Sequence, residues 1–323
     1  MKRRGLLGLL AASTALPARL RAQGSLPTVG YLGSETPEVF ASRLAAFREG
    51  LASQGFDEGR SVTIEYVWAH SRNERLPALA AELVARNVKV IVAPGSLAAA
   101  LAAKAATTTV PVVFETGADP VAAGLVTNLH RPGGNITGVT SLNAEVGPKR
   151  LELLRELVPA AKIAAVLVNP TNPRNTEATV ASMTAATRAL GLELRILNAS
   201  REEEFEPAFA AARRADMLTI ANETFFNRPL QLVALSVKHA VPTAHQSREF
   251  ALAGGLMSYG GIVAQSHRQA GIYVGRVLKG ERPADLPVQQ ATKVEFMINT
   301  RTAKVLGLTV PISLLSRADE VIE

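Results

Sequence analysis

The chain has 323 residues, of which 47% are hydrophobic and 20% are charged, and these proportions are typical of a globular protein with a sizeable core. Its length fits two domains of ordinary size. Cysteine is absent, which excludes thiol nucleophiles, thiolate metal sites and disulfides. The formal net charge is +7, and most of it lies near the N-terminus.

The first predicted element is an export signal at residues 1–22. Three basic residues at positions 2–4 precede a short apolar run at 6–16, and Ala22 is the expected cleavage position. The adjacent arginines also fit a twin-arginine signal, so Sec and twin-arginine export both stay open. The apolar run is too short for an anchoring helix, and Gly, Pro or charged residues interrupt every later one.

Removal of the signal lowers the net charge from +7 to +2, because residues 1–22 contain five Lys or Arg and no acid. The remaining basic residues are spread along the chain and form only short pairs such as Arg213-Arg214. A nucleic-acid interface needs them concentrated on one element. We therefore expect no nucleic-acid partner.

From residue 28 the chain alternates β-rich apolar runs with helical patterns. Four apolar runs in the first half predict strands, namely TVGYLGS (28–34), SVTIEYVWA (61–69), VKVIVAPG (88–95) and VPVVFETG (110–117). Ser71 with Glu74 has the spacing of a capping box and predicts the start of the second helix. The runs are continuously apolar rather than alternating, which indicates parallel strands covered on both faces.

A second alternation follows, with predicted strands at 163–170, 193–200, 217–222 and 241–247. Two βα arrays of similar size predict an α/β protein of two doubly wound, Rossmann-like lobes with a ligand cleft between them. We expect the first lobe to comprise 28–141 with about 251–283. The second lobe is then 142–250 with about 284–323, so that GGLMSYGG and the helix after it return to the first lobe and KVEFMIN to the second.

The sequence carries no catalytic constellation. The five histidines have no metal-binding spacing, and there is no GxSxG elbow, no GxGxxG after a strand and no Walker motif. We therefore expect no enzyme activity, no catalytic residue, no metal site and no cofactor.

Small polar residues instead follow the predicted strands in both halves. They are Ser34, Gly95, Ser96 and Asp119 in the first half and Asn169, Asn172 and Asn222 in the second. Any one of them is explained as a helix cap. In a doubly wound sheet, however, the carboxyl ends of the strands line the ligand crevice, and helix N-termini there suit a ligand carboxylate. Together they predict a clamp for a small zwitterion or polar anion.

Asp119 is the acid of this set and directly precedes Pro120, which predicts a cap at a helix start. A carboxylate on the wall of a cleft also suits a ligand ammonium or hydroxyl group. We predict that Asp119 is both a cap and a ligand contact.

Long stretches of the chain resemble the tryptophan-transporter-like branch of ABC transporter substrate-binding proteins. They cover the mature chain in order and comprise residues 119–140, 149–159, 165–173, 248–260, 275–311 and 316–323. The resemblance implies a type I periplasmic-binding-protein fold with three crossovers between lobes that close on a small molecule. It also implies delivery to a membrane permease with its ATPase.

The resemblance adds Thr116 and Gln246 to the expected ligand contacts, and some relatives are associated with amino acids. Many relatives are lipoproteins, but this chain lacks the required cysteine. We therefore expect a freely diffusing periplasmic protein without a membrane anchor. Two other functions stay open on the same scaffold: a receptor that signals its liganded state to a partner, and a hydrolase, which the missing nucleophile disfavours.

Overall fold

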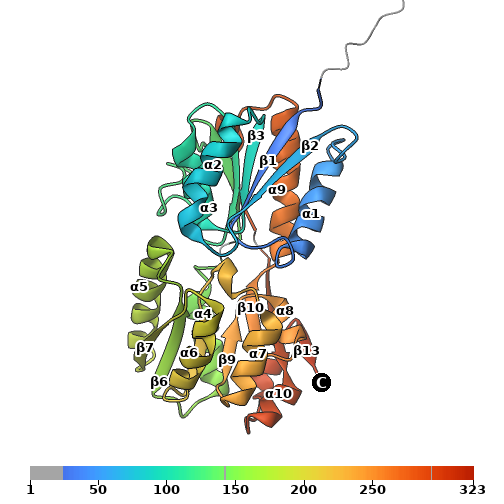
Figure 1. The fold of residues 1–323 in the computed structure, drawn as a ribbon. Coiled ribbons are helices and arrows are strands. Elements are labelled where there is room, and N and C mark those ends of the chain that lie inside the picture. The colour runs from blue at the N-terminus through green and yellow to red at the C-terminus, as the bar shows by residue number, and fades with distance from the viewer. Residues whose placement is uncertain (1–24, 142, 292) are drawn as a thin grey trace, which may run out of the picture.

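The computed structural model describes residues 25–141, 143–291 and 293–323, so the expected export signal at 1–22 lies outside the described residues. The described residues form two α/β lobes, one above the other in Figure 1. None of the helices in these three ranges is at once long and apolar enough to cross a bilayer.

The first lobe is built on a six-stranded sheet with the order β11-β5-β4-β3-β1-β2, and all its neighbouring strands are parallel. The strands are β1 (Thr28–Gly33), β2 (Thr63–Trp68), β3 (Val90–Pro94), β4 (Val112–Thr116), β5 (Ile136–Thr140) and β11 (Gln289–Gln290). Helices cover both faces, which explains the continuously apolar strands. On one face lie α2 (Leu76–Ala85) and α3 (Leu97–Ala106), and on the other α1 (Ala41–Ala52) and α9 (Val263–Leu278).

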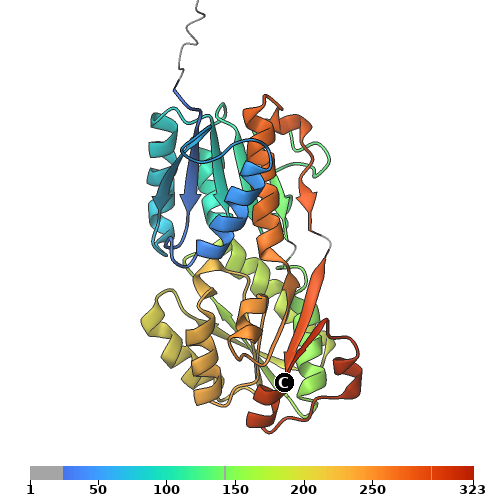
Figure 2. The same ribbon diagram turned by 90° about the vertical axis from the view of Figure 1, so that its right-hand side faces the viewer.

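Helices α1 and α9 come from opposite ends of the chain and pack closely side by side (Figures 1 and 2). Glycines make this contact possible. A β-carbon on Gly50 would lie 1.9 Å from the carbonyl oxygen of Arg268, and one on Gly271 would lie 2.1 Å from that of Phe47. Neither position therefore has room for a side chain.

The second lobe contains a seven-stranded sheet with the order β13-β12-β10-β9-β8-β6-β7. Its strands are parallel except for the antiparallel pair β10–β12. They are β6 (Ile163–Val168), β7 (Glu193–Asn198), β8 (Met217–Ile220), β9 (Thr243–His245), β10 (Met257–Gly261), β12 (Val294–Asn299) and β13 (Glu320–Ile322). The helices of this lobe are α4 (Gly147–Leu157), α5 (Pro173–Ala189), α6 (Phe205–Ala212), α7 (Pro229–Lys238), α8 (Arg248–Leu252), α10 (Thr300–Val305) and α11 (Ile312–Leu315). Single 3₁₀ turns also occur in both lobes. In the first lobe they are η1 (Asn73–Arg75) and η4 (Pro283–Asp285), and in the second lobe η2 (Glu202–Glu204) and η3 (Thr224–Phe226).

The chain crosses between the lobes three times, after β5, after β10 and after β11. This confirms the expected pair of doubly wound α/β lobes, but the crossing points differ from the expected ones. Residues 251–261 stay with the second lobe, because β10 pairs with β9 and with β12. Residues 284–290 stay with the first lobe, because β11 pairs with β5 and the Thr137 hydroxyl donates to the Leu286 carbonyl.

The two sheets share one strand order, 2-1-3-4-5 counted within each lobe. In such a sheet the order reverses between the first and third strands, and ligands bind at the carboxyl ends of that pair. The reversal lies between β1 and β3 in the first lobe and between β6 and β8 in the second. The segments after these four strands therefore define the candidate site.

Candidate functional site

Five of the predicted residues come together at the centre of the cleft. A small cavity of about 10 Å³ is lined from both lobes, among others by Gly95, Ser96, Thr116, Asn172 and Asn222. This volume is too small for a ligand. The strand-end pattern, and the resemblance in the case of Thr116, therefore identified residues that are neighbours in the fold. The lobes themselves, however, fill the space between these residues.

Direct contacts between the lobes account for the missing space. The hydroxyl oxygens of Ser34, after β1, and Thr224, in η3, form a buried hydrogen bond of 3.0 Å. The Thr224 methyl carbon would be only 3.3 Å from a β-carbon on Gly95, which has φ of +81°. A β-carbon on Gly117 would lie 2.1 Å from the Asn222 amide nitrogen. Two glycines thus let side chains of the second lobe reach the backbone of the first.

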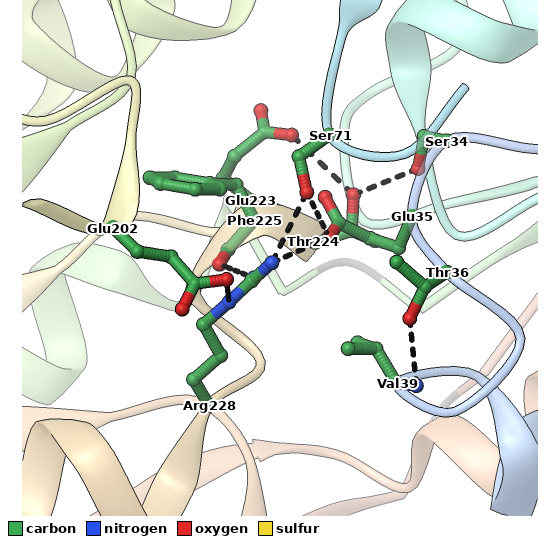
Figure 3. Close-up of polar contacts among 10 residues, drawn as sticks. All are labelled: Ser34, Glu35, Thr36, Val39, Ser71, Glu202, Glu223, Thr224, Phe225 and Arg228. Carbon is green, nitrogen blue, oxygen red and sulfur yellow. Dashed lines mark hydrogen bonds and ion pairs between the residues drawn. The ribbon is translucent and has the colours of Figure 1, made fainter.

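An ion pair joins the lobes beside these contacts (Figure 3). The Arg228 guanidinium Nη2 donates to Glu35 Oε2 at 3.0 Å, and only 10% and 2% of these side chains are exposed. The Ser71 hydroxyl donates to the same carboxylate oxygen at 2.7 Å and accepts from Arg228 at 3.0 Å. Ser71 therefore does not cap a helix as expected: it has φ of +62° and α2 begins at Leu76, after η1.

Glu223 is a second buried carboxylate at this interface. Its Oε2 accepts from the side-chain amides of Asn172 at 2.7 Å and Asn175 at 3.4 Å. Burial raises its pKa to about 7, and the nearby carboxylate of Glu35 acts in the same direction. The Asn172 hydrogen bond opposes this shift without cancelling it.

Glu115 is a third buried carboxylate, at the end of β4. It accepts from the Gly95 amide at 2.9 Å, and the Nδ1 atom of His267 lies 3.7 Å away. Burial raises its pKa to about 7 against the opposing effect of the Arg43 charge. The first lobe thus holds this acid inside its own structure rather than on the cleft surface.

A larger cavity of about 590 Å³ opens beside the filled centre, and both lobes line it. Its apolar wall consists of Leu97, Ala118, Ala122, Ala123, Ala144 and Ala178. Its charged lining consists of Asp119, Glu145, Glu177 and Arg174. Arg174, near the start of α5, also reaches across the lobes and donates to the Ala123 carbonyl at 3.2 Å. The uncharged polar residues Asn175, Thr179 and Ser182 complete the lining, so the cavity is amphipathic, with an apolar wall beside charged and polar side chains.

Asp119 lies on the wall of this cavity and not at the filled centre. Its Oδ1 accepts from the backbone amides of Val121 at 2.8 Å and Ala122 at 3.2 Å, so it caps a turn. The expected helix does not follow, because the segment between β4 and β5 forms turns and no helix. The side chain is exposed, so it can cap the turn and still face a molecule in the cavity. Burial of Glu145 raises its pKa, and the charge of Asp119 adds to the shift.

The remaining predicted residues lie outside both cavities. Asn169 Oδ1 accepts from the Thr171 amide and hydroxyl, and so shapes the turn before α5. Gln246 is buried and lines a separate cavity of about 30 Å³. Its Oε1 has no hydrogen-bond partner among the described residues. Within the same residues, no cluster of three or more His, Asp or Glu could hold a metal ion.

Glu35, Arg228 and Glu223 were not among the predicted residues. Glu35 and Glu223 each follow a predicted residue, Ser34 and Asn222, so extending the strand-end pattern by one position would have found them. Arg228 carries no such signal, because it precedes Pro229 at a helix start in the middle of the second half.

The chain matches the family model described as ABC transporter substrate binding protein over residues 39–322. A tyrosine-binding protein from Clostridioides difficile (strain R20291) is 26% identical over 265 residues, which cover 81% of this chain and 75% of that protein. Both matches span the two lobes and the cavity between them.

Solved structures show the same fold. The ABC domain from Streptococcus pneumoniae in complex with L-Trp is 24% identical and superposes with a TM-score of 0.82 over 92% of this chain and all of that one. The ligand-free, open structure of a substrate binding protein from Clostridium difficile is 22% identical, with a TM-score of 0.62 over 92% of this chain and 99% of that one.

Proposed function

Because the chain belongs to the ABC transporter substrate binding protein family, we propose that it binds an amino acid or a related small carboxylate and delivers it to a membrane permease with its ATPase. Family membership also identifies the protein as a substrate-binding protein rather than an enzyme. The observation that carries the proposed ligand class is the amphipathic cavity of about 590 Å³ between the lobes.

The cavity has the features that a zwitterion with an apolar side chain requires. Its volume lies in the range of small-molecule sites, which is roughly 300–1,000 Å³. Asp119 and Glu145 can face an ammonium group, whereas Arg174 and the first turn of α5 can face a carboxylate. The alanines leave an apolar surface for the rest of the ligand. Tyrosine and tryptophan, which the similar proteins bind, are amino acids of this kind.

In the proposed mechanism the lobes open to admit the ligand and close around it. Contacts that exist only in the closed form stabilise it, so the ligand shifts an equilibrium between open and closed lobes. The residues at the filled centre, Ser34, Gly95, Ser96, Thr116, Asn172 and Asn222, become accessible to ligand only when the lobes separate. Asp119 faces the ligand in the closed form. The proposed location is the periplasm, after cleavage near Ala22 and without a lipid anchor.

A thermal-shift screen of the mature chain, starting at Gln23, tests the proposal. The panel contains tyrosine, tryptophan, other amino acids, small dicarboxylates and nucleosides. A ligand that binds only the folded protein raises the melting temperature by mass action, by an amount that grows with its concentration over Kd. We expect a shift of several degrees from one or a few amino acids, confirmed by calorimetric titration. A response to nucleosides or dicarboxylates alone would overturn the proposed ligand class.

A further inference from the structure

We propose that Glu35 and Arg228 form a latch that holds the two lobes closed independently of any ligand, with Arg228 as the residue that positions the second lobe. The pair lies outside the large cavity, and neither residue lines it. Its contacts therefore act on closure itself rather than on the bound molecule. The latch rests on the proposed function in one respect, namely that the lobes open and close.

Each half of the latch is held in place by its own lobe. In the second lobe, Glu202 accepts from Arg228 Nε at 2.7 Å, the Phe225 carbonyl accepts from Nη1, and the guanidinium carbon lies 4.9 Å from the centre of the Phe225 ring (Figure 3). In the first lobe, the Ser71 hydroxyl holds Glu35 at 2.7 Å. Because both partners are ordered before they meet, closing the lobes costs little additional side-chain entropy.

Because the ion pair is buried, removing one of its two charges changes the free energy of closure strongly. When both are present, the guanidinium compensates a carboxylate that is only 2% exposed. When Arg228 alone is removed, closing the lobes buries the charge of Glu35 without a partner, which is strongly unfavourable. The open form is unaffected, because water then solvates the carboxylate. Removal of Arg228 should therefore shift the protein towards the open form.

The neighbouring contact supplies a reporter of closure. Ser34 and Thr224 belong to different lobes, and their hydroxyl oxygens are 3.0 Å apart in the closed form. Cysteines at both positions would bring two sulfur atoms within reach of a disulfide only when the lobes are closed. Because the chain has no cysteine of its own, no other disulfide can form within one molecule, and non-reducing electrophoresis separates this product from disulfide-linked dimers.

The experiment measures disulfide formation in the mature Ser34→Cys/Thr224→Cys protein at a fixed oxidant concentration, with no ligand added. We expect cross-linking in this background and at least a tenfold slower rate when Arg228→Met is added. The matched control is Arg201→Met, which removes an arginine whose ion pair with Glu204 lies within the second lobe. A rate within twofold of the background for Arg228→Met would overturn the latch.

A second variant protects the test against a folding defect. Glu35→Gln removes the charge from the opposite lobe while keeping an acceptor for Ser71 and Arg228, and it should also slow cross-linking. Far-ultraviolet circular dichroism identifies variants that fold. If Arg228→Met does not fold, Glu35→Gln decides, and an unchanged rate overturns the latch. No amino-acid ligand is added in the cross-linking measurement, so its result does not depend on the ligand class. If the ligand screen failed but Arg228→Met slowed cross-linking, the proposed ligand class would be rejected and the latch would stand.

Discussion

Asn222 of the second lobe lies directly over Gly117 of the first, so closely that a β-carbon on the glycine would be 2.1 Å from the asparagine amide nitrogen. The backbone of the first lobe is thus part of the surface on which the second lobe closes. Any side chain at this position must displace Asn222, whose backbone carbonyl is itself held by the Asn175 amide at 2.8 Å.

The Gly117→Ala substitution should therefore weaken ligand binding. The added methyl group clashes with Asn222 only in the closed form, and overpacking of this kind costs about 1–3 kcal/mol. Affinity should fall roughly tenfold to a hundredfold, because 1.4 kcal/mol corresponds to a factor of ten. Calorimetric titration with the ligand found in the thermal-shift screen measures the loss.

Gly147→Ala is the matched control for this prediction. Gly147 also lies in the part of the chain near the cleft, but a β-carbon there would be 3.9 Å from its nearest neighbour, the Met183 sulfur. This variant should bind like the unmodified protein. Equal affinities for both variants would show that Gly117 does not limit closure.

Two substitutions separate the roles of Asp119. Asp119→Ser keeps an oxygen that can cap the turn and removes the charge, so the melting temperature without ligand should stay unchanged. Loss of a hydrogen bond to a charged group costs about 1.5–3 kcal/mol, so affinity should fall at least tenfold. Asp119→Ala should show the same loss of affinity and an additional loss of about 1 kcal/mol of stability from the missing cap. Unimpaired binding by Asp119→Ser would leave the residue as a cap alone.

Closure should depend on pH through Glu223. Its pKa is raised to about 7 by burial in the closed form, so the closed form takes up a proton that the open form, with a solvated carboxylate, does not hold. Raising the pH from about 5 to about 7 should therefore favour opening and weaken ligand binding, and the effect should level off above pH 7, where the carboxyl group is ionised in both forms. Glu223→Gln should reduce this pH dependence, and a variant that retains all of it would exclude Glu223 as its source.

The stability of the first lobe should depend on pH through Glu115. Because the folded protein raises the pKa of this carboxyl to about 7, its protonated form is favoured on folding, and stability falls as the pH rises from about 5 towards 8. Glu115→Gln should reduce the difference in melting temperature between pH 5 and pH 8. Glu74→Gln, at an exposed position, is the control and should leave the difference unchanged.

The alternation of apolar runs and helical patterns was sufficient to predict the two lobes, because buried parallel strands are continuously apolar and short. The crossing points were harder to predict. The run that forms β10 is rich in glycine and directly precedes a segment of the first lobe, the helix α9. Its antiparallel partner β12 comes more than 30 residues later. Local pattern does not reveal pairing over such a distance, since pairing is decided by tertiary contacts.

For the site, the same topology that places strand ends together placed Gly95, Ser96, Thr116, Asn172 and Asn222 around one point. The sequence could not show that the lobes touch there, because such contacts depend on two glycines of the first lobe and two side chains of the second. The buried acids were also missed. Glu115 is a single charged residue in an apolar strand, and only the fold shows that it meets the Gly95 amide.

The pairing of α1 with α9 has a consequence for how the chain is made. A polypeptide emerging from the ribosome contains the five principal strands of the first lobe by residue 140. Until residue 278 it lacks α9, one of the two helices that cover the face formed by Val29, Tyr31 and Val113. The edge strand β11 arrives later still. The first lobe therefore begins to form first but completes its core only after most of the second lobe has been made. A chain cut after α8 should leave an uncovered apolar face and aggregate, however well its strands are formed.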